Sequence, residues 1–70
     1  MKRRKVHSSL VASVGYSTKT ATLEIEFTNG TVYHYSDVPL AIYRAFLASE
    51  SKGVFFNNEV KGFFRYDQVT

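Results

Sequence analysis

The chain has 70 residues, of which 44% are hydrophobic and 21% are charged, so it has the composition of one small globular domain. It contains no cysteine, which excludes disulfide bonds, cysteine-bound zinc and a thiol nucleophile, and which favours a cytoplasmic location. No apolar run approaches the roughly 20 residues of a membrane span, and the polar segment 7–9 interrupts the basic start, so we predict neither a membrane span nor an export signal.

The net charge of +3 is concentrated at the amino end of the chain. Lys2, Arg3, Arg4 and Lys5 are all basic, whereas the rest of the chain holds five basic and six acidic side chains and is close to neutral. Chain ends are commonly disordered. We therefore predict a flexible basic arm over residues 1–8 and a folded domain over residues 9–70.

Two strands joined by a hairpin loop are predicted first. Residues 10–16 place apolar side chains at every second position, which is the period of a half-buried strand. A polar loop over residues 17–20 leads to a second alternating strand over residues 21–27. The predicted buried side of this second strand consists of Leu23, Ile25 and Phe27. Its other side carries Glu24 and Glu26, so we expect one face of the sheet to be buried and the other to be open.

Asn29-Gly30 predicts a tight turn into a third strand over residues 31–35. The length of this turn decides which face Tyr33 and Tyr35 occupy. A two-residue turn places both rings on the open face, where they could stack on nucleic-acid bases, whereas a three-residue turn with a left-handed Gly30 places them on the buried face. We favour the three-residue turn, because burying a large side chain stabilises a fold by about 1.5–3 kcal/mol.

A helix is predicted next. The only proline, Pro39, suits the first turn of a helix that we expect to run to about Ser51. Gly53 is expected to end this helix in a left-handed conformation. One arc of the helix is apolar and should face the sheet, whereas the opposite arc consists mostly of alanines and is a candidate contact surface.

The remaining chain predicts a short helical turn, capped by Asn57 or Asn58, and a last strand. The strand is indicated by the alternation over residues 63–69, with Phe64 and Tyr66 on its buried side. The predicted order is β-β-β-α-short α-β. It is an α+β fold in which a small antiparallel sheet packs on one amphipathic helix.

Short motifs occur along most of the chain. In chain order they are Gly15-Tyr16, Leu23-x-Ile25-x-Phe27-x-Asn29-Gly30, Tyr33-x-Tyr35-x-x-Val38-Pro39, Tyr43, Ala48-x-x-Ser51-x-Gly53-x-x-Phe56-Asn57, Val60-Lys61 and Tyr66. Together they resemble the KTSC domain, a family named for the carboxy-terminal domain of some lysyl-tRNA synthetases. The central Tyr33-x-Tyr35 is similar to the hallmark of that family, and the resemblance extends over residues 9–69. It implies a compact fold of the kind predicted above and, through the attachment to these synthetases, a role in RNA binding.

No motif for catalysis, metal binding or cofactor binding is present. Two histidines without cysteine offer few metal ligands, and four dispersed glycines form no phosphate-binding loop. A catalytic triad could be composed of Ser36, His34 and Asp37. Such triads are defined by their geometry in space, however, and the closeness of these residues in the sequence does not predict that geometry. We therefore predict a non-catalytic binding module without cofactor or metal.

Two kinds of partner are predicted, and neither is a membrane. Nucleic acid, above all RNA, would contact the basic side chains through its phosphates. The candidate contact residues are Lys2, Arg3, Arg4, Lys5, Lys52, Lys61 and Arg65. The alternative is a partner protein or a second copy of this chain, which would contact the alanine-rich helix face and any exposed phenylalanine of the pairs 55–56 and 63–64.

Overall fold

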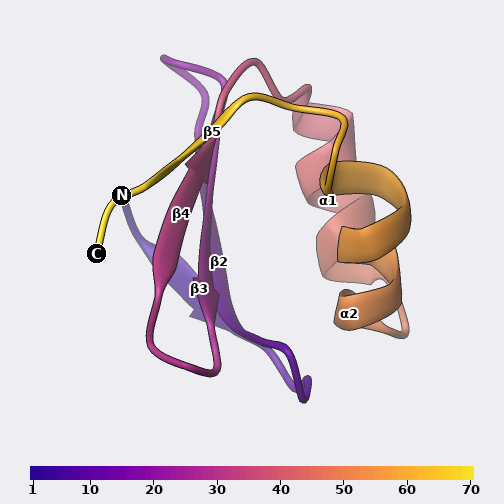
Figure 1. The fold of residues 1–70 in the computed structure, drawn as a ribbon. Helices are drawn as coiled ribbons and strands as arrows, with labels where there is room; N and C mark the ends of the chain where they lie inside the picture. The colour runs from indigo at the N-terminus through magenta and orange to yellow at the C-terminus, as the bar shows by residue number, and fades with distance from the viewer.

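The computed structural model describes residues 1–70 as a five-stranded antiparallel sheet with all helical segments on one of its faces (Figure 1). The strands lie in the sheet in their chain order, β1-β2-β3-β4-β5. The elements are β1 (Arg3–Lys5), β2 (Val11–Ser17), β3 (Thr22–Phe27), β4 (Val32–Tyr35), α1 (Leu40–Ala48), α2 (Lys52–Phe55), the π-helix η1 (Phe56–Val60) and β5 (Tyr66–Gln68). The predicted α+β fold is therefore confirmed, with one strand more than predicted. None of these helices has the length and apolar character that crossing a membrane requires.

The pairing of β2 with β3 contains an irregularity that could not be predicted from the sequence. The register shifts between Val11 and Ser13, so Val11 and Val14 both lie on the helix-covered face and both are fully buried. Strict alternation over residues 10–16 had placed Ala12 on that face. A bulge of this kind adds one residue to one strand and reverses the alternation beyond it.

The turn between β3 and β4 has the three-residue form. The backbone N–H of Phe27 donates to the carbonyl of Thr31, and Gly30, with φ of +90°, donates to the carbonyl of Phe27. Tyr33 and Tyr35 lie directly opposite the buried isoleucine and leucine of β3. The prediction that both rings join the buried face is confirmed, and Tyr35 is only 5% exposed.

Residues Arg3–Lys5 form the edge strand β1, which differs from the predicted flexible arm over residues 1–8. β1 pairs with β2, and Arg3 lies opposite Gly15. A Cβ atom at Gly15 would lie 2.7 Å from the backbone oxygen of Lys2, so only glycine allows β1 to lie this close. A three-residue strand made of basic side chains has no apolar alternation, and the sequence therefore gave no signal for it.

The helix predicted from Pro39 to about Ser51 ends earlier in the structure. Pro39 occupies the N-cap of α1, and the helix ends at Ala48. Ser51 then starts α2, because its hydroxyl oxygen accepts a hydrogen bond from the backbone N–H of Val54 at 3.2 Å. Gly53 lies inside α2 rather than after a helix, so its predicted role as a helix terminator is wrong.

The π-helix η1 follows α2 without a break. The backbone N–H of Lys61 donates to the carbonyl of Phe56 at 2.8 Å, which closes the wide turn of a π-helix. Asn57 and Asn58 lie exposed within η1, so neither caps a helical turn as predicted. The wide turn directs both Phe56 and Val60 into the core.

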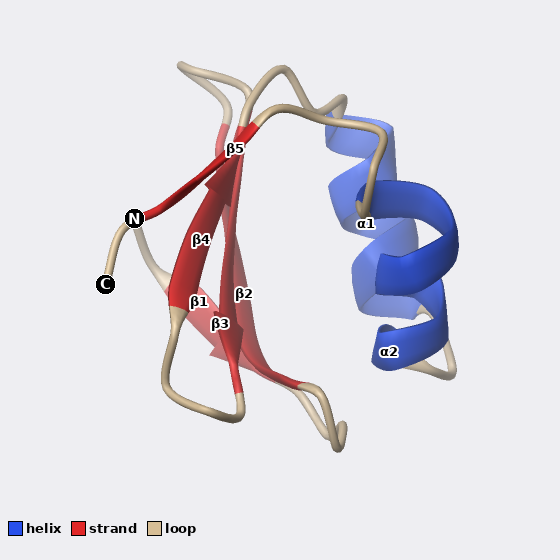
Figure 2. Ribbon diagram, viewed as in Figure 1, coloured by secondary structure: helices blue, strands red, loops and turns tan.

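The hydrophobic core lies between the sheet and the helices (Figure 2). Its buried residues are Val11, Val14, Leu23, Ile25, Tyr35, Val38, Phe46, Phe56 and Val60. Tyr66 lies opposite Tyr35 and faces the same side, as predicted, but it is 58% exposed because β5 is an edge strand. Phe64 packs partly buried against the core just before β5 begins. The core is therefore complete around Tyr35 but open at Tyr66.

Candidate nucleic-acid interface

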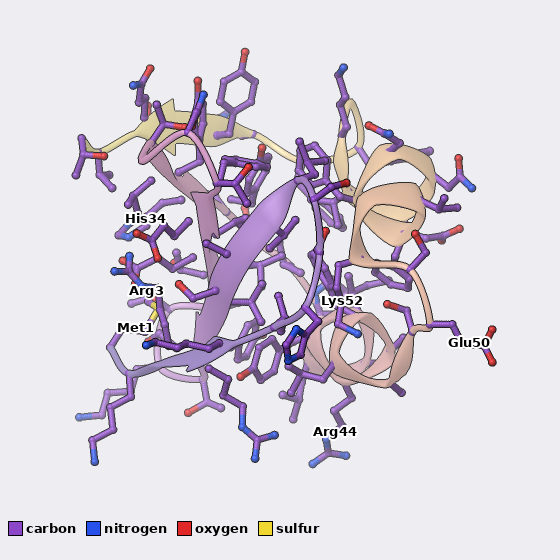
Figure 3. The ribbon with its side chains drawn as sticks, turned by 90° about the horizontal axis from the view of Figure 1, so that it is seen from below. Met1, Arg3, His34, Arg44, Glu50 and Lys52 are labelled. Carbon is purple, nitrogen blue, oxygen red and sulfur yellow. The ribbon has the colours of Figure 1, made fainter.

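The basic side chains do not form one continuous surface. Arg4, Lys5 and Lys52 line a shallow hollow of about 510 Å³, which we call the basic hollow. Arg4 and Lys5 come from β1, whereas Lys52 comes from the first turn of α2, so the fold brings together residues far apart in the sequence. Glu50 is the one acidic residue at this hollow, and it is exposed on the segment between α1 and α2 (Figure 3). The basic hollow therefore brings together three of the seven cations predicted from the sequence, of which Lys5 also borders Arg3 and the glutamates of the open face.

Lys52 is held in place by the end of the preceding helix. Its Nζ donates a hydrogen bond to the backbone oxygen of Ser49, where α1 has just ended. Unpaired carbonyls at the end of a helix carry a partial negative charge, which favours a cation there. The Lys52 ammonium group is therefore positioned by the break between α1 and α2.

Arg3 points to the open face of the sheet instead. Its Nη1 lies 3.5 Å from Oε1 of Glu24, and Glu24 Oε2 lies 2.6 Å from Nε2 of His34. Gly15 lies between Arg3 and Glu24 in the same row and has no side chain to separate them. Figure 3 shows Arg3 and His34 on the side of the sheet away from Lys52. Arg3 therefore pairs with Glu24 on the open face and does not line the basic hollow.

This open face does not have the geometry of a catalytic or metal site. His34 hydrogen-bonds Glu24 and makes no hydrogen bond to Ser36 or Asp37, its neighbours in the hypothetical triad. No group of three or more histidine, aspartate or glutamate side chains converges anywhere in the structure. On the open face, Glu24 therefore pairs with Arg3 and contacts His34.

Lys61 lies at a second hollow, next to aromatic rings. This aromatic pocket of about 380 Å³ is lined chiefly by Phe27, Tyr33, Tyr35, Phe56, Tyr66 and Lys61. It lies on the helix-covered face, between the edge formed by β4 and β5 and the turn that follows η1. Arg65 is exposed just before β5 and lines neither hollow, and Lys2 is likewise exposed and outside both. Lys61 and Lys52 therefore belong to different surfaces.

Three tyrosine rings form the wall of the aromatic pocket. The ring centroids of Tyr33 and Tyr35 are 6.3 Å apart and their planes differ by 24°, which is a stacked arrangement. The ring of Tyr66 lies 5.7 Å from Tyr33 and 5.8 Å from Tyr35. Burial, reinforced by the neighbouring phenols of Tyr33 and Tyr66, raises the pKa of Tyr35 to about 12. The Tyr35 phenol is therefore neutral at physiological pH.

Sequence reasoning missed this pocket, although it singled out several of its residues. The pairing of β4 with β5 places Tyr66 beside Tyr33 and Tyr35, and β5 follows the helices along the chain. A register between strands that far apart cannot be read from local alternation. The available signal was the two-residue alternation, which includes Tyr33 and Tyr35 in one segment and Tyr66 in the other.

Comparisons with known proteins agree with this fold over nearly all of the chain. Residues 7–66 match the family model described as the KTSC domain. The crystal structure of a KTSC domain protein from Yersinia pestis superimposes with a TM-score of 0.93 at 36% identity, covering 99% of this chain and 97% of that one. An uncharacterized protein from Stutzerimonas stutzeri is 39% identical over 61 residues, which is 87% of this chain and 86% of that protein. A lysine–tRNA ligase from Nostoc punctiforme is 38% identical over 66 residues, and this chain spans only 12% of the length of that ligase.

Proposed function

This chain belongs to the KTSC domain family, and we propose that it is a non-catalytic module that binds RNA through its basic side chains. The observation that carries the proposal is the convergence of Arg4, Lys5 and Lys52 on the basic hollow. The similarity to one region of a lysine–tRNA ligase supports RNA over other polyanions, because the ligase is named for its action on a tRNA.

The size of the basic hollow suits weak, salt-dependent binding. Each phosphate contact releases condensed counterions, so the logarithm of the binding constant falls with the logarithm of salt concentration by about 0.7 per contact on a single strand. Three cations from β1 and α2 therefore supply a modest affinity that does not depend on base sequence. Arg4 and Lys5 are exposed, whereas Lys52 is half-buried with its ammonium group held at the end of α1.

The test is the binding of a single-stranded RNA oligonucleotide over a range of salt concentrations. We expect Arg4→Gln with Lys5→Gln to weaken binding and to reduce the salt slope by about 1.4, since two contacts are lost. The matched control is Lys19→Gln with Arg44→Gln, which removes the same charge from exposed positions outside the basic hollow. Equal loss in both double variants, or no binding by the wild type at low salt, would overturn the proposal.

Self-association is a second candidate function, favoured by two apolar side chains on the surface. Val54 on α2 is 58% exposed and Phe63, in the turn after η1, is 66% exposed. Apolar side chains of this kind lose contact with water when two copies associate, which favours association. Sedimentation at high protein concentration should then detect a dimer that Val54→Ser with Phe63→Ser reduces to a monomer, and a monomeric wild type would contradict this candidate.

A further inference from the structure

We propose that the aromatic pocket holds one unpaired base of the bound RNA, which stacks on Tyr66 and meets the tilted ring of Tyr33 at its edge, while Lys61 contacts the adjacent phosphate. The inference rests on the proposed function and assigns a second surface to it. The aromatic pocket is separate from the basic hollow, because it lies at the β4–β5 side of the sheet and not at β1.

The arrangement of the rings favours a flat aromatic ligand. Tyr66 is 58% exposed and Tyr33 is half-buried, so both rings present surface to the pocket. Tyr35 is nearly buried and packs edge-to-face against Phe56 at 5.8 Å, which fixes the floor. Phe27 packs edge-to-face against both Tyr33 and Phe56. The accessible rings are thus held in place by others and are not free to collapse into the pocket, and every base has a face that can stack on such rings.

The polar groups at the pocket favour a nucleotide over an apolar segment of protein. Lys61 supplies a positive charge, and no acidic side chain lines the pocket. Asn29 accepts hydrogen bonds from the backbone N–H and the hydroxyl of Thr31 through Oδ1, which leaves its amide NH₂ group available as a donor at the rim. An aromatic wall with one cation and one orienting amide donor matches the ring, the phosphate and the polar edge of a nucleotide.

The size of the pocket suits a single nucleotide. A volume of about 380 Å³ lies near the lower end of the range for small-molecule sites, about 300–1,000 Å³. A paired base cannot enter such a pocket without leaving its helix. The pocket therefore selects single-stranded or looped RNA, which is the form in which bases are exposed for stacking.

The π-helix η1 positions two residues of the aromatic pocket. Phe56 begins η1 and contributes to the floor, while Lys61 directly follows η1 and its backbone N–H closes the wide turn onto Phe56. π-helical turns are rare and frequently occur at functional sites. Here the wide turn accounts for the position of the cation beside the rings.

The first experiment separates base recognition from phosphate binding. The probes are adenosine 5′-monophosphate and ribose 5-phosphate, titrated into the ¹⁵N- and ¹³C-labelled chain and followed by NMR. We expect the nucleotide to shift the ring resonances of Tyr33 and Tyr66, and we expect ribose 5-phosphate to shift Lys61 without the rings. Equal shifts of the rings with both probes, or no ring shift with either, would overturn the inference.

The second experiment measures the contribution of stacking with an oligoadenylate of about eight nucleotides and an abasic strand of equal length and charge. The wild type should bind the base-bearing strand about 5- to 150-fold more tightly than the abasic strand, as expected for one stacked base. Tyr66→Ala should remove most of that ratio, whereas Tyr66→Phe, which keeps the ring, should preserve it. Tyr66 is exposed at an edge strand, so its replacement leaves the core intact.

The matched control is Phe63→Ala, which removes an exposed ring outside the pocket and should leave the ratio unchanged. Equal binding of both strands by the wild type, or a ratio unaffected by Tyr66→Ala, overturns the base pocket while leaving RNA binding through the basic hollow in place. Failure of both strands to bind overturns the proposed function, and the mononucleotide titration then decides the pocket independently.

Discussion

Gly15 is the residue on which the amino-terminal strand depends. It lies in β2 between Arg3 on β1 and Glu24 on β3, and its missing side chain lets the Arg3 guanidinium reach across β2 to the carboxylate. The same absence lets the backbone at Lys2 approach within 2.7 Å of the position that a Cβ would occupy. One glycine therefore makes both the strand pairing and the ion pair possible.

We expect Gly15→Ala to displace β1 from the sheet and to lower the free energy of unfolding by about 1–3 kcal/mol, as for other overpacked sites. Amide hydrogen exchange should show faster exchange in Arg3–Lys5, with little change in β3 and β4. The control is Gly53→Ala, since a Cβ there would meet Leu10 at an ordinary 3.7 Å inside α2 and should be neutral or stabilise by up to about 1 kcal/mol. Unchanged protection of β1 in Gly15→Ala would contradict the steric argument.

Tyr35 should make the stability of the fold fall at high pH. The pKa of Tyr35 is raised from 10 to about 12 in the folded chain, so between these values the folded state holds a proton that the unfolded state has lost. The free energy of unfolding then decreases as pH rises through this interval, by up to about 3 kcal/mol from this group alone. Urea unfolding of the wild type and of Tyr35→Phe between pH 9 and about pH 12 measures the difference.

The phenylalanine variant should match the wild type near neutral pH, because no hydrogen bond within the chain depends on the Tyr35 hydroxyl. It should then lose less stability above pH 10. Parallel curves for the two proteins over that interval would show that the phenol titrates normally.

At the scale of elements, the meander β2–β4 and its buried face could be predicted from the sequence, and the helical region could not be predicted in detail. Alternation over residues 21–27 and the turn at Gly30 carry enough local information to fix the face of Tyr33 and Tyr35. The division of this region into α1, α2 and η1 has no glycine or proline at its boundaries. It depends instead on packing of Phe46, Phe56 and Val60 into the same core, which is a tertiary property.

Ser51 should be the residue that maintains this division. Ser51→Ala removes the oxygen that accepts from the backbone N–H of Val54, and loss of such a cap costs about 0.5–2 kcal/mol. Asn58→Ala is the matched control, since Asn58 is exposed in η1 and caps nothing, and it should change stability by less than about 0.5 kcal/mol. Thermal unfolding of both variants is sufficient. A larger loss in Asn58→Ala than in Ser51→Ala would show that the sequence-based assignment of the cap was correct.

At the scale of the whole molecule, the two proposed contact surfaces are separated by the width of the sheet. The basic hollow belongs to β1 and α2 and the aromatic pocket to the β4–β5 edge, in a molecule measuring 28 × 25 × 23 Å. The candidate site could be predicted from the sequence only as separate residues, because the grouping of Lys52 with Arg4 and of Lys61 with Tyr66 depends on the complete topology. An RNA strand that reaches both surfaces must cross the molecule.

We therefore expect affinity to increase with RNA length and then to level off. The plateau should fall within the roughly 4–16 nucleotides that small single-strand-binding folds occupy. With four contacting cations, the salt slope of a strand at the plateau should be about −3. Fluorescence anisotropy of a length series checks both values, and Arg4→Gln with Lys5→Gln should shorten the length at which affinity stops rising. Equal affinity for a dinucleotide and for the longest strand would contradict the two-surface arrangement.

Both chain ends lie on the side of the sheet that faces away from the helices (Figure 1). Met1 precedes the edge strand β1, and Thr70 follows the opposite edge strand β5, where its hydroxyl accepts a hydrogen bond from the backbone N–H of Val32. A linker that crosses the open face of the sheet can therefore join Thr70 to Met1, and the chain can be reopened in the hairpin between β2 and β3. Such a circular permutant would keep every helix in place, and β1 would then follow β5 along the chain instead of starting it.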